Sequence, residues 1–254
     1  MRRKFLGYTK NVFLLLAVLL VWEISSLNVN PLFIPSPEKV FSDLKETIFN
    51  GTLIKATWYS FKRITVSTLL SSTMSIPIAI GIYNISLVRN ILNPIISAFR
   101  YVPVTAFYPL LIMWFGIDEE MKIAFLFIAM FVYMMPSVIL CLDEINPDLI
   151  DTGKTIGMNK AQLILMVQIP SSMPSILNSF IMMFGIGWTY IAIAETINAK
   201  YGLGYVIQQS SMRGRTDLVF MAIIVIMIIS VVFDNVSKTL VRKLFRWRYI
   251  KEND

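Results

Sequence analysis

Residues 146–170 read NPDLIDTGKTIGMNKAQLILMVQIP, the longest polar interruption in the second half of a very apolar chain. Asn146 suits the N-cap of a short helix, with Pro147 at the first helical position, where a missing N–H costs little. Gly157 suits the residue just past that helix, because glycine adopts positive φ without a Cβ clash. The first part of the stretch therefore predicts a short helix that ends at a tight reversal.

A second short helix is predicted directly after this reversal. Asn159 and Gln162 have the spacing of a capping box, in which each side chain satisfies the other residue's backbone N–H. Pro170 is expected to close the unit. Two short helices folded about a glycine, between apolar segments, are typical of a docking element, although an ordinary helical hairpin would show the same caps.

The composition indicates an integral membrane protein. Of the 254 residues, 56% are hydrophobic and only 15% are charged, whereas a soluble domain carries roughly a quarter charged residues. The chain has no histidine, which excludes Ser-His-Asp triads and histidine-based zinc sites. Its one cysteine, Cys141, excludes an intrachain disulfide framework. We therefore predict neither a catalytic centre nor a metal site.

The apolar runs predict an all-α fold with one transmembrane domain over residues 1–254. Six spans are expected, at approximately 12–27, 64–83, 91–115, 123–142, 173–194 and 218–236. The first could be a signal peptide, but Glu23 interrupts it and no small-x-small cleavage site follows, so an uncleaved span is favoured. The third contains Pro94, Pro103 and Pro109, which should kink or break it.

The distribution of basic residues predicts the orientation. Six spans place both termini on one side, which holds thirteen of the 23 lysines and arginines, against nine on the opposite side. The excess favours cytoplasmic N- and C-termini in a multi-pass protein of the cell membrane. The basic tail at residues 241–254 is best interpreted as an anchor on membrane lipid rather than a nucleic-acid site. Residues 38–49 have the spacing of an amphipathic surface helix, with Val40 and Phe41 on its apolar side.

Residues 151–170 resemble the EAA loop of permease subunits of ATP-binding-cassette (ABC) importers. That loop reads Glu-Ala-Ala, three residues, Gly, nine residues, then Ile-x-Leu-Pro, and here the triplet is DTG while the glycine and proline keep their spacing. Three further segments resemble the branch that handles nitrate, sulfonates, taurine and bicarbonate: Ile34–Pro37, Arg100–Gly116 and Gly202–Tyr205 with the following TDLVF. The tail LFRWR at 244–248 resembles the end of that family's chains.

The resemblance implies a type I importer permease of the MetI-like fold, with six transmembrane helices and a cytoplasmic two-helix coupling loop. The implied partners are a cytoplasmic ABC ATPase dimer, a second permease copy, expected to complete a homodimer although a paralogue stays open, and an extracytoplasmic solute-binding protein. ATP would be hydrolysed by the ATPase, and this chain would bind no cofactor; it lacks a GxxxxGK[ST] phosphate loop. The residues implied in coupling are Asp151, Thr152, Gly153, Gly157, Val167, Ile169 and Pro170.

Polar and aromatic residues within the predicted spans are candidates for the transport pathway. Arg100 and Glu195 are charges at or near membrane depth, and either belong to a structural ion pair or act along the pathway. Trp188 and Tyr190 either line the pathway or pack against neighbouring helices.

Two other classes of function stay open from the residues alone. An intramembrane enzyme would need paired carboxylates, a Ser/Lys pair or histidine ligands, and the scattered acids and missing histidines disfavour it. An ATP-independent carrier or channel would predict inverted repeats, and none is evident. The sequence does not identify the transported substrate.

Overall fold

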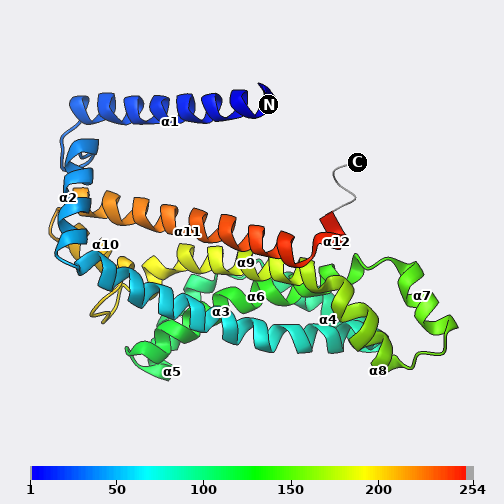
Figure 1. Ribbon diagram of the computed structural model, residues 1–254. Helices are drawn as coiled ribbons and strands as arrows, with labels where there is room; N and C mark the ends of the chain where they lie inside the picture. Colours follow the sequence, from blue (N-terminus) through cyan, green and yellow to red (C-terminus); the bar gives the residue numbers. More distant parts are fainter. Residues whose placement is uncertain (1, 250–254) are drawn as a thin grey trace. The chain divides into compact units, whose positions relative to one another are not determined.

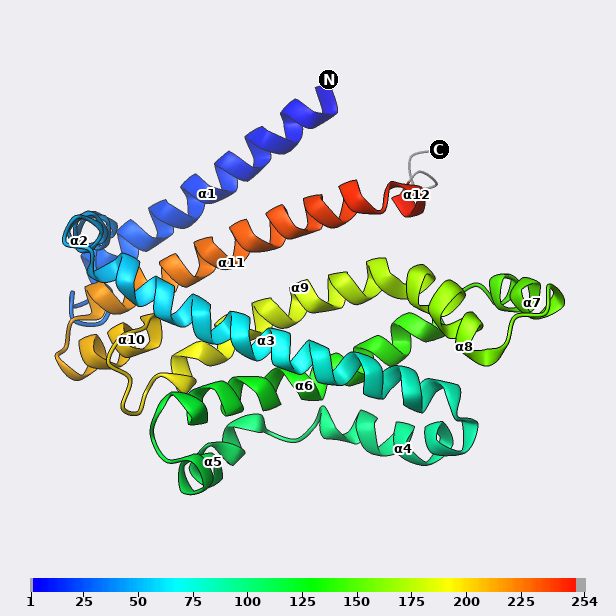
Figure 2. The same ribbon diagram turned by 60° about the horizontal axis from the view of Figure 1, so that its bottom comes forward.

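The computed structural model describes the backbone of residues 2–249 and the side chains of residues 13–248, and every regular element in this part is helical (Figures 1 and 2). The predicted all-α class is confirmed. Residues 250–254 of the predicted basic tail lie outside the described part. The elements, in chain order, are α1 (Arg2–Asn28), α2 (Pro37–Phe49), α3 (Thr52–Asn84), α4 (Ser86–Phe99), η1 (Val104–Phe107), α5 (Tyr108–Phe115), α6 (Glu119–Asp143), α7 (Pro147–Thr155), α8 (Lys160–Gln162), η2 (Leu163–Gln168), α9 (Ile169–Ala194), α10 (Leu203–Met212), α11 (Thr216–Leu244) and α12 (Arg246–Tyr249).

The chain divides into two compact units. The N-terminal unit comprises the residues up to Ser60 together with Lys200–Met227, and the core unit comprises Phe61–Ala199 and the residues from Ile228 onward. Helices α1, α2 and α10 belong to the first unit, and α4 to α9 belong to the second. Helices α3 and α11 each contribute to both.

Four stretches of helix in the described part are long and apolar enough to cross a membrane. They are Thr52–Asn84, Glu119–Asp143, Lys160–Ala194 and Thr216–Leu244. The bent pair α4 and η1–α5 would make a fifth, and the apolar part of α1, Phe13–Asn28, is shorter. The boundaries of the six predicted spans, and the first span in particular, stay predictions.

The segment predicted as the third span is a broken helix. Ser86–Phe99 and Val104–Phe115 meet at 86°. Pro94 lies inside α4 without ending it, whereas Pro103 caps η1 in an extended conformation and Pro109 lies in the first turn of α5. Proline disfavours helical geometry in the residue before it and cannot donate to the preceding turn, so the break falls at Pro103.

In the N-terminal unit, an inward-facing acid orients α2. Ser36 caps this helix by accepting a hydrogen bond from the Lys39 N–H (3.3 Å). Asp43 is only 2% exposed and pairs with Arg215 across 3.3 Å. Val40 is buried beside Asp43, whereas Phe41 is 44% exposed. The predicted helix over residues 38–49 agrees with α2, and its position on the membrane surface stays a prediction.

The core unit is built around the antiparallel pair α6 and α9, which lie side by side in both views (Figures 1 and 2). At Gly187 of α9, side chains of α6 and α3 come close to the backbone. A Cβ at this position would lie 2.5 Å from Met130 Cε and 2.7 Å from Ile64 Cγ2. Met130 and Ile64 are both fully buried, so a Cβ at this point would require both side chains to shift. Gly185 has open space instead, so the two glycines serve different faces.

Candidate functional site: the 146–170 loop and the buried charges

The loop at residues 146–170 protrudes from one end of the α6–α9 pair, here called the loop end (Figure 2). The Asn146 side chain accepts a hydrogen bond from the Asp148 N–H (3.0 Å), and Pro147 opens α7. The predicted first helix and its cap are confirmed. Asp148 lies in the first turn, where its negative charge interacts favourably with the helix dipole and stabilises the helix.

The reversal after α7 depends on Gly157. Its φ is +84°, in the left-handed region. The Met158 N–H donates to the Gly153 carbonyl (3.0 Å) and the Gly157 N–H to the Lys154 carbonyl (3.0 Å), so the chain turns back while satisfying the carbonyls at the helix end. This predicted role of Gly157 is confirmed.

Gly153 fixes the packing of the two arms of the loop. It is the buried residue of α7, and a Cβ there would lie 2.6 Å from Leu163 Cδ2 and 3.2 Å from Met158 Sδ. The last residue of the DTG triplet is therefore a glycine whose missing Cβ lets α7 pack closely against Leu163 of η2. Asp151 and Thr152 of the same triplet are exposed, and Asp151 pairs with Lys154 (2.9 Å) at the surface.

The second arm begins as predicted and continues differently. Asn159 and Gln162 form the reciprocal capping box, with both bonds at 2.9 Å. The helix does not close at Pro170, however, because Lys160–Ala194 forms one helical path. The wider π-helical turn η2 precedes Pro170, which lies in the first turn of α9, where its missing N–H is tolerated. Val167 and Ile169 are half-buried and Pro170 is exposed.

The sequence did not reveal two side-chain contacts at the loop end, one from the loop to α3 and one between α4 and α6. Gln168, only 6% exposed, exchanges two amide hydrogen bonds with Asn84 at the end of α3, at 2.9 and 3.0 Å. Arg89 at the start of α4 pairs with Asp143 at the end of α6. The second arm of the loop is thus attached to the end of α3, and an ion pair joins α4 to α6 just before the loop begins.

The outward surface of the loop is apolar to an unusual degree. Leu149 of α7 and its C-cap residue Ile156 are 48% and 68% exposed, and Leu165 and Met166 of η2 are each 65% exposed. A short, internally braced element therefore presents exposed apolar side chains at the surface of the loop.

A buried ion-pair cluster occupies the opposite end of the core unit, here called the far end. Arg63 of α3 is 3% exposed and contacts Glu195 across 2.6 Å and Glu119 across 2.7 Å. Glu195 follows α9 and is fully buried, whereas Glu119 at the start of α6 is 56% exposed. Arg63 of α3 thus joins the start of α6 to the end of α9.

Lys122 adds a second buried cation to this end. It is fully buried, and its Nζ donates to the carbonyls of Ile117 (2.9 Å) and Asp118 (3.1 Å). The sequence reasoning missed Arg63 and Lys122 because it placed both just outside the predicted spans. Their position one turn or less from a long apolar run was the available signal.

The predicted pathway candidates do not converge on one place. Glu195 pairs with Arg63, and no ion pair joins Arg100 to an acid among the side chains of residues 13–248. Arg100 is exposed at the break after α4. Trp188 is 2% exposed beside Phe184, whereas the half-buried Tyr190 contacts the edge of Phe125. Both aromatic side chains therefore pack among neighbouring helices in this conformation.

Comparison with known proteins identifies the family. Residues 71–246 match the family described as the binding-protein-dependent transport system inner membrane component. The chain belongs to this family. It is a permease subunit of an ABC importer, a transport protein rather than an enzyme.

Relatives of the permease cover nearly its whole length. It is 32% identical to the taurine transport system permease protein TauC of Escherichia coli, over 91% of this chain and 87% of that one. It is 27% identical to the putative aliphatic sulfonates transport permease protein SsuC of Bacillus subtilis, over 97% and 90%. These matches confirm the sulfonate and taurine branch that the sequence motifs indicated.

Solved structures share its fold. An inward-facing structure of the MetNI methionine ABC transporter matches with a TM-score of 0.67 at 20% identity, over 76% of the permease and 95% of that chain. A bacterial alginate ABC transporter matches with a TM-score of 0.59 at 17% identity, over 94% and 97%. The expected MetI-like fold is confirmed.

Proposed function

We propose that residues 146–170 couple this permease to a cytoplasmic ABC ATPase dimer. The observation that carries the proposal is the combination of a braced loop, an exposed apolar face and direct attachment to helix ends. Leu149 and Ile156 would seat in a cleft of the ATPase, and burial of such side chains supplies most of the binding free energy of a small interface. The Gln168–Asn84 amide pair would then pass motion of the loop to α3 as a rigid-body displacement.

The partners and orientation follow from this placement. The loop end would face the cytoplasm, together with both termini, in agreement with the excess of basic residues on that side. The second permease copy would be identical, and an extracytoplasmic solute-binding protein would deliver the substrate at the far end. ATP would be bound and hydrolysed by the ATPase, with no cofactor on this chain.

We infer a small organic sulfonate or a related oxyanion as the substrate. This inference is supported by two relatives that are named as taurine and aliphatic sulfonate permeases and are 32% and 27% identical to this chain. Within the core unit, the buried cations Arg63 and Lys122 have acidic or carbonyl partners, so they are not available to hold a multiply charged anion.

Co-purification from native membranes tests the coupling loop. A tagged parent is compared with Leu149→Asp/Ile156→Asp and with the control Ile117→Asp, which replaces an equally apolar and 44% exposed residue at the far end. The parent and the control should recover an ABC ATPase identified by mass spectrometry, and the double variant should lose it. Retention of the ATPase by the double variant would exclude this docking surface, and absence of an ATPase from folded parent would contradict coupling to ATP hydrolysis.

A further inference from the structure

One face of α3 carries a stripe of buried hydroxyl groups that continues into an apolar groove. Ser71, Ser75, Ile78 and Ile82 follow a spacing of three and four residues, which places them on one face of the helix. Ser71 and Ser75 are fully buried, and neighbouring Ser72 is 5% exposed. The same face packs against α6 one turn earlier, where the Thr68 hydroxyl lies 3.1 Å from Met130 Sδ.

The hydroxyl groups of these three serines lack hydrogen-bond partners. Among the described side chains and backbone, none bonds to the Oγ atoms of Ser71, Ser72 or Ser75. A serine in a helix can donate to the carbonyl four residues earlier, and in this chain Thr68 and Ser172 do so at 2.7 Å. The three serines leave that bond unmade, although an unsatisfied buried hydroxyl is costly.

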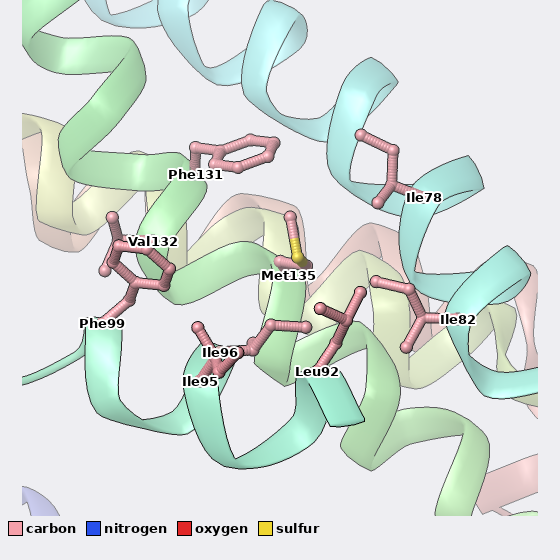
Figure 3. A pocket seen from close by; sticks show the side chains of 9 residues that line it. All are labelled: Ile78, Ile82, Leu92, Ile95, Ile96, Phe99, Phe131, Val132 and Met135. Atoms are coloured by element: carbon pink, nitrogen blue, oxygen red, sulfur yellow. The ribbon is translucent and has the colours of Figure 1, made fainter. Parts of the chain in front are cut away.

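The groove lies beside the stripe toward the loop end. Figure 3 shows Ile78 and Ile82 of α3 facing Phe99 of α4, with Phe131 and Met135 of α6 between them. The cavity has a volume of about 300 Å³, and its nine lining side chains are all apolar. It therefore suits a hydrocarbon group and offers no partner to a charged one.

The broken helix borders the groove. Phe99 ends α4 and lines the groove, and the 86° bend toward η1 follows it directly. Irregular backbone at membrane depth is tolerated where it is buried in protein or lines a water-filled cavity, and discontinuous helices commonly form substrate sites in transporters. Unpaired hydroxyls, an apolar groove and a helix break thus meet along one side of α3.

From this arrangement we propose that the Ser71–Ile82 face of α3 lines the substrate pathway. The serine hydroxyls donate hydrogen bonds to the oxygens of a sulfonate head group, and the groove receives its aliphatic part. Neutral donors hold an oxyanion more weakly than a buried arginine, which suits a site that must also release its ligand. This proposal rests on the importer function and on the sulfonate class inferred above.

Cysteine labelling tests the proposal, because Cys141 is the chain's one cysteine and Cys141→Ser provides a cysteine-free background. Ser71→Cys, Ser75→Cys and Ile78→Cys are introduced singly into the permease, assembled with its ATPase and binding protein in liposomes. Leu70→Cys and Met74→Cys are the matched controls, since these neighbours are 46% and 48% exposed on other faces of α3. A charged methanethiosulfonate reagent labels thiols that reach water.

The three pathway cysteines should be labelled during ATP turnover, and both controls should stay unlabelled. Butanesulfonate at about ten times its dissociation constant should slow labelling about tenfold, because the unoccupied fraction falls by that factor. Unlabelled cysteines in variants that still transport would overturn the proposal. Labelling that butanesulfonate does not slow would contradict the proposal that this face binds the substrate. A cysteine-free parent that transports nothing in response to ATP would instead contradict the proposed coupling.

Discussion

The loop at residues 146–170 and the ion-pair cluster at the far end are stabilised by different kinds of contact. Each connects several helices of the core unit. The internal shape of the loop is set by neighbours in sequence: caps at Asn146 and Asn159 and a positive φ at Gly157. The cluster joins Arg63 to Glu119 and Glu195, which lie 56 and 132 residues away along the chain.

The difference shows where each region is vulnerable. Local capping bonds are each worth about 1 kcal/mol, so the loop tolerates many single changes, while its function depends on shape. A buried ion pair contributes little net stability when intact but costs several kcal/mol when one partner is removed. We therefore expect stability effects to concentrate at the far end and transport effects at the loop end.

The largest expected effect is on Arg63. Arg63→Met removes the cation that contacts the fully buried carboxylate of Glu195 across 2.6 Å and should destabilise the permease by about 3–5 kcal/mol. Thermal unfolding in detergent, followed by tryptophan fluorescence, measures this. The double variant Arg63→Met/Glu195→Gln should recover most of the loss, and a double variant as unstable as the single one would contradict an ion-pair role.

The next effect separates shape from stability in the loop. Gly153→Leu places side-chain atoms where Leu163 already lies, with a Cβ contact of 2.6 Å, and overpacking of this kind costs about 1–3 kcal/mol. We expect normal membrane insertion but transport that is at least about tenfold slower. A tenfold decrease corresponds to an activation free energy for transport raised by about 1.4 kcal/mol. Gly185→Ala, which enters open space, is the control and should transport normally.

A smaller effect is expected at the amide pair between α3 and the loop. Gln168→Ala removes two hydrogen bonds and leaves Asn84 Oδ1 without its donor, while Asn84 Nδ2 still donates to the Ile80 carbonyl (2.9 Å); we expect a cost of about 1–2 kcal/mol. The ATPase should still co-purify, but its stimulation by the loaded binding protein should fall. Gln168→Glu with Asn84→Lys restores a pair and should restore stimulation; equal stimulation in Gln168→Ala and parent would exclude transmission through this contact.

The smallest effect is expected at the surface pair of Asp151 and Lys154. Their side chains are 70% and 60% exposed, and exposed pairs contribute about 0–1 kcal/mol. Asp151→Asn should change thermal stability by less than about 0.5 kcal/mol. If Asp151→Asn keeps its thermal stability but recovers less ATPase on co-purification, the loss reports a contact between Asp151 and the ATPase rather than the pair with Lys154.

Local chemistry made several elements predictable from the sequence alone. Proline, glycine and asparagine at fixed offsets determined the caps and the reversal of the loop, because these residues act on the backbone of their own turn. Long apolar runs determined the helical class, since a helix satisfies its backbone within the segment. The EAA-like spacing placed the chain in its family, and the match over residues 71–246 agrees.

Long-range packing decided the rest. No local sequence pattern predicts that Arg63 pairs with Glu195 or that Gln168 pairs with Asn84, because both contacts depend on how distant helices align. The continuation of the helix through Pro170 depends on a π-helical turn that no local pattern predicted. The sequence determined where the chain turns and which segments are apolar; the tertiary structure decided which faces meet, because burial and ion pairing are properties of several helices together.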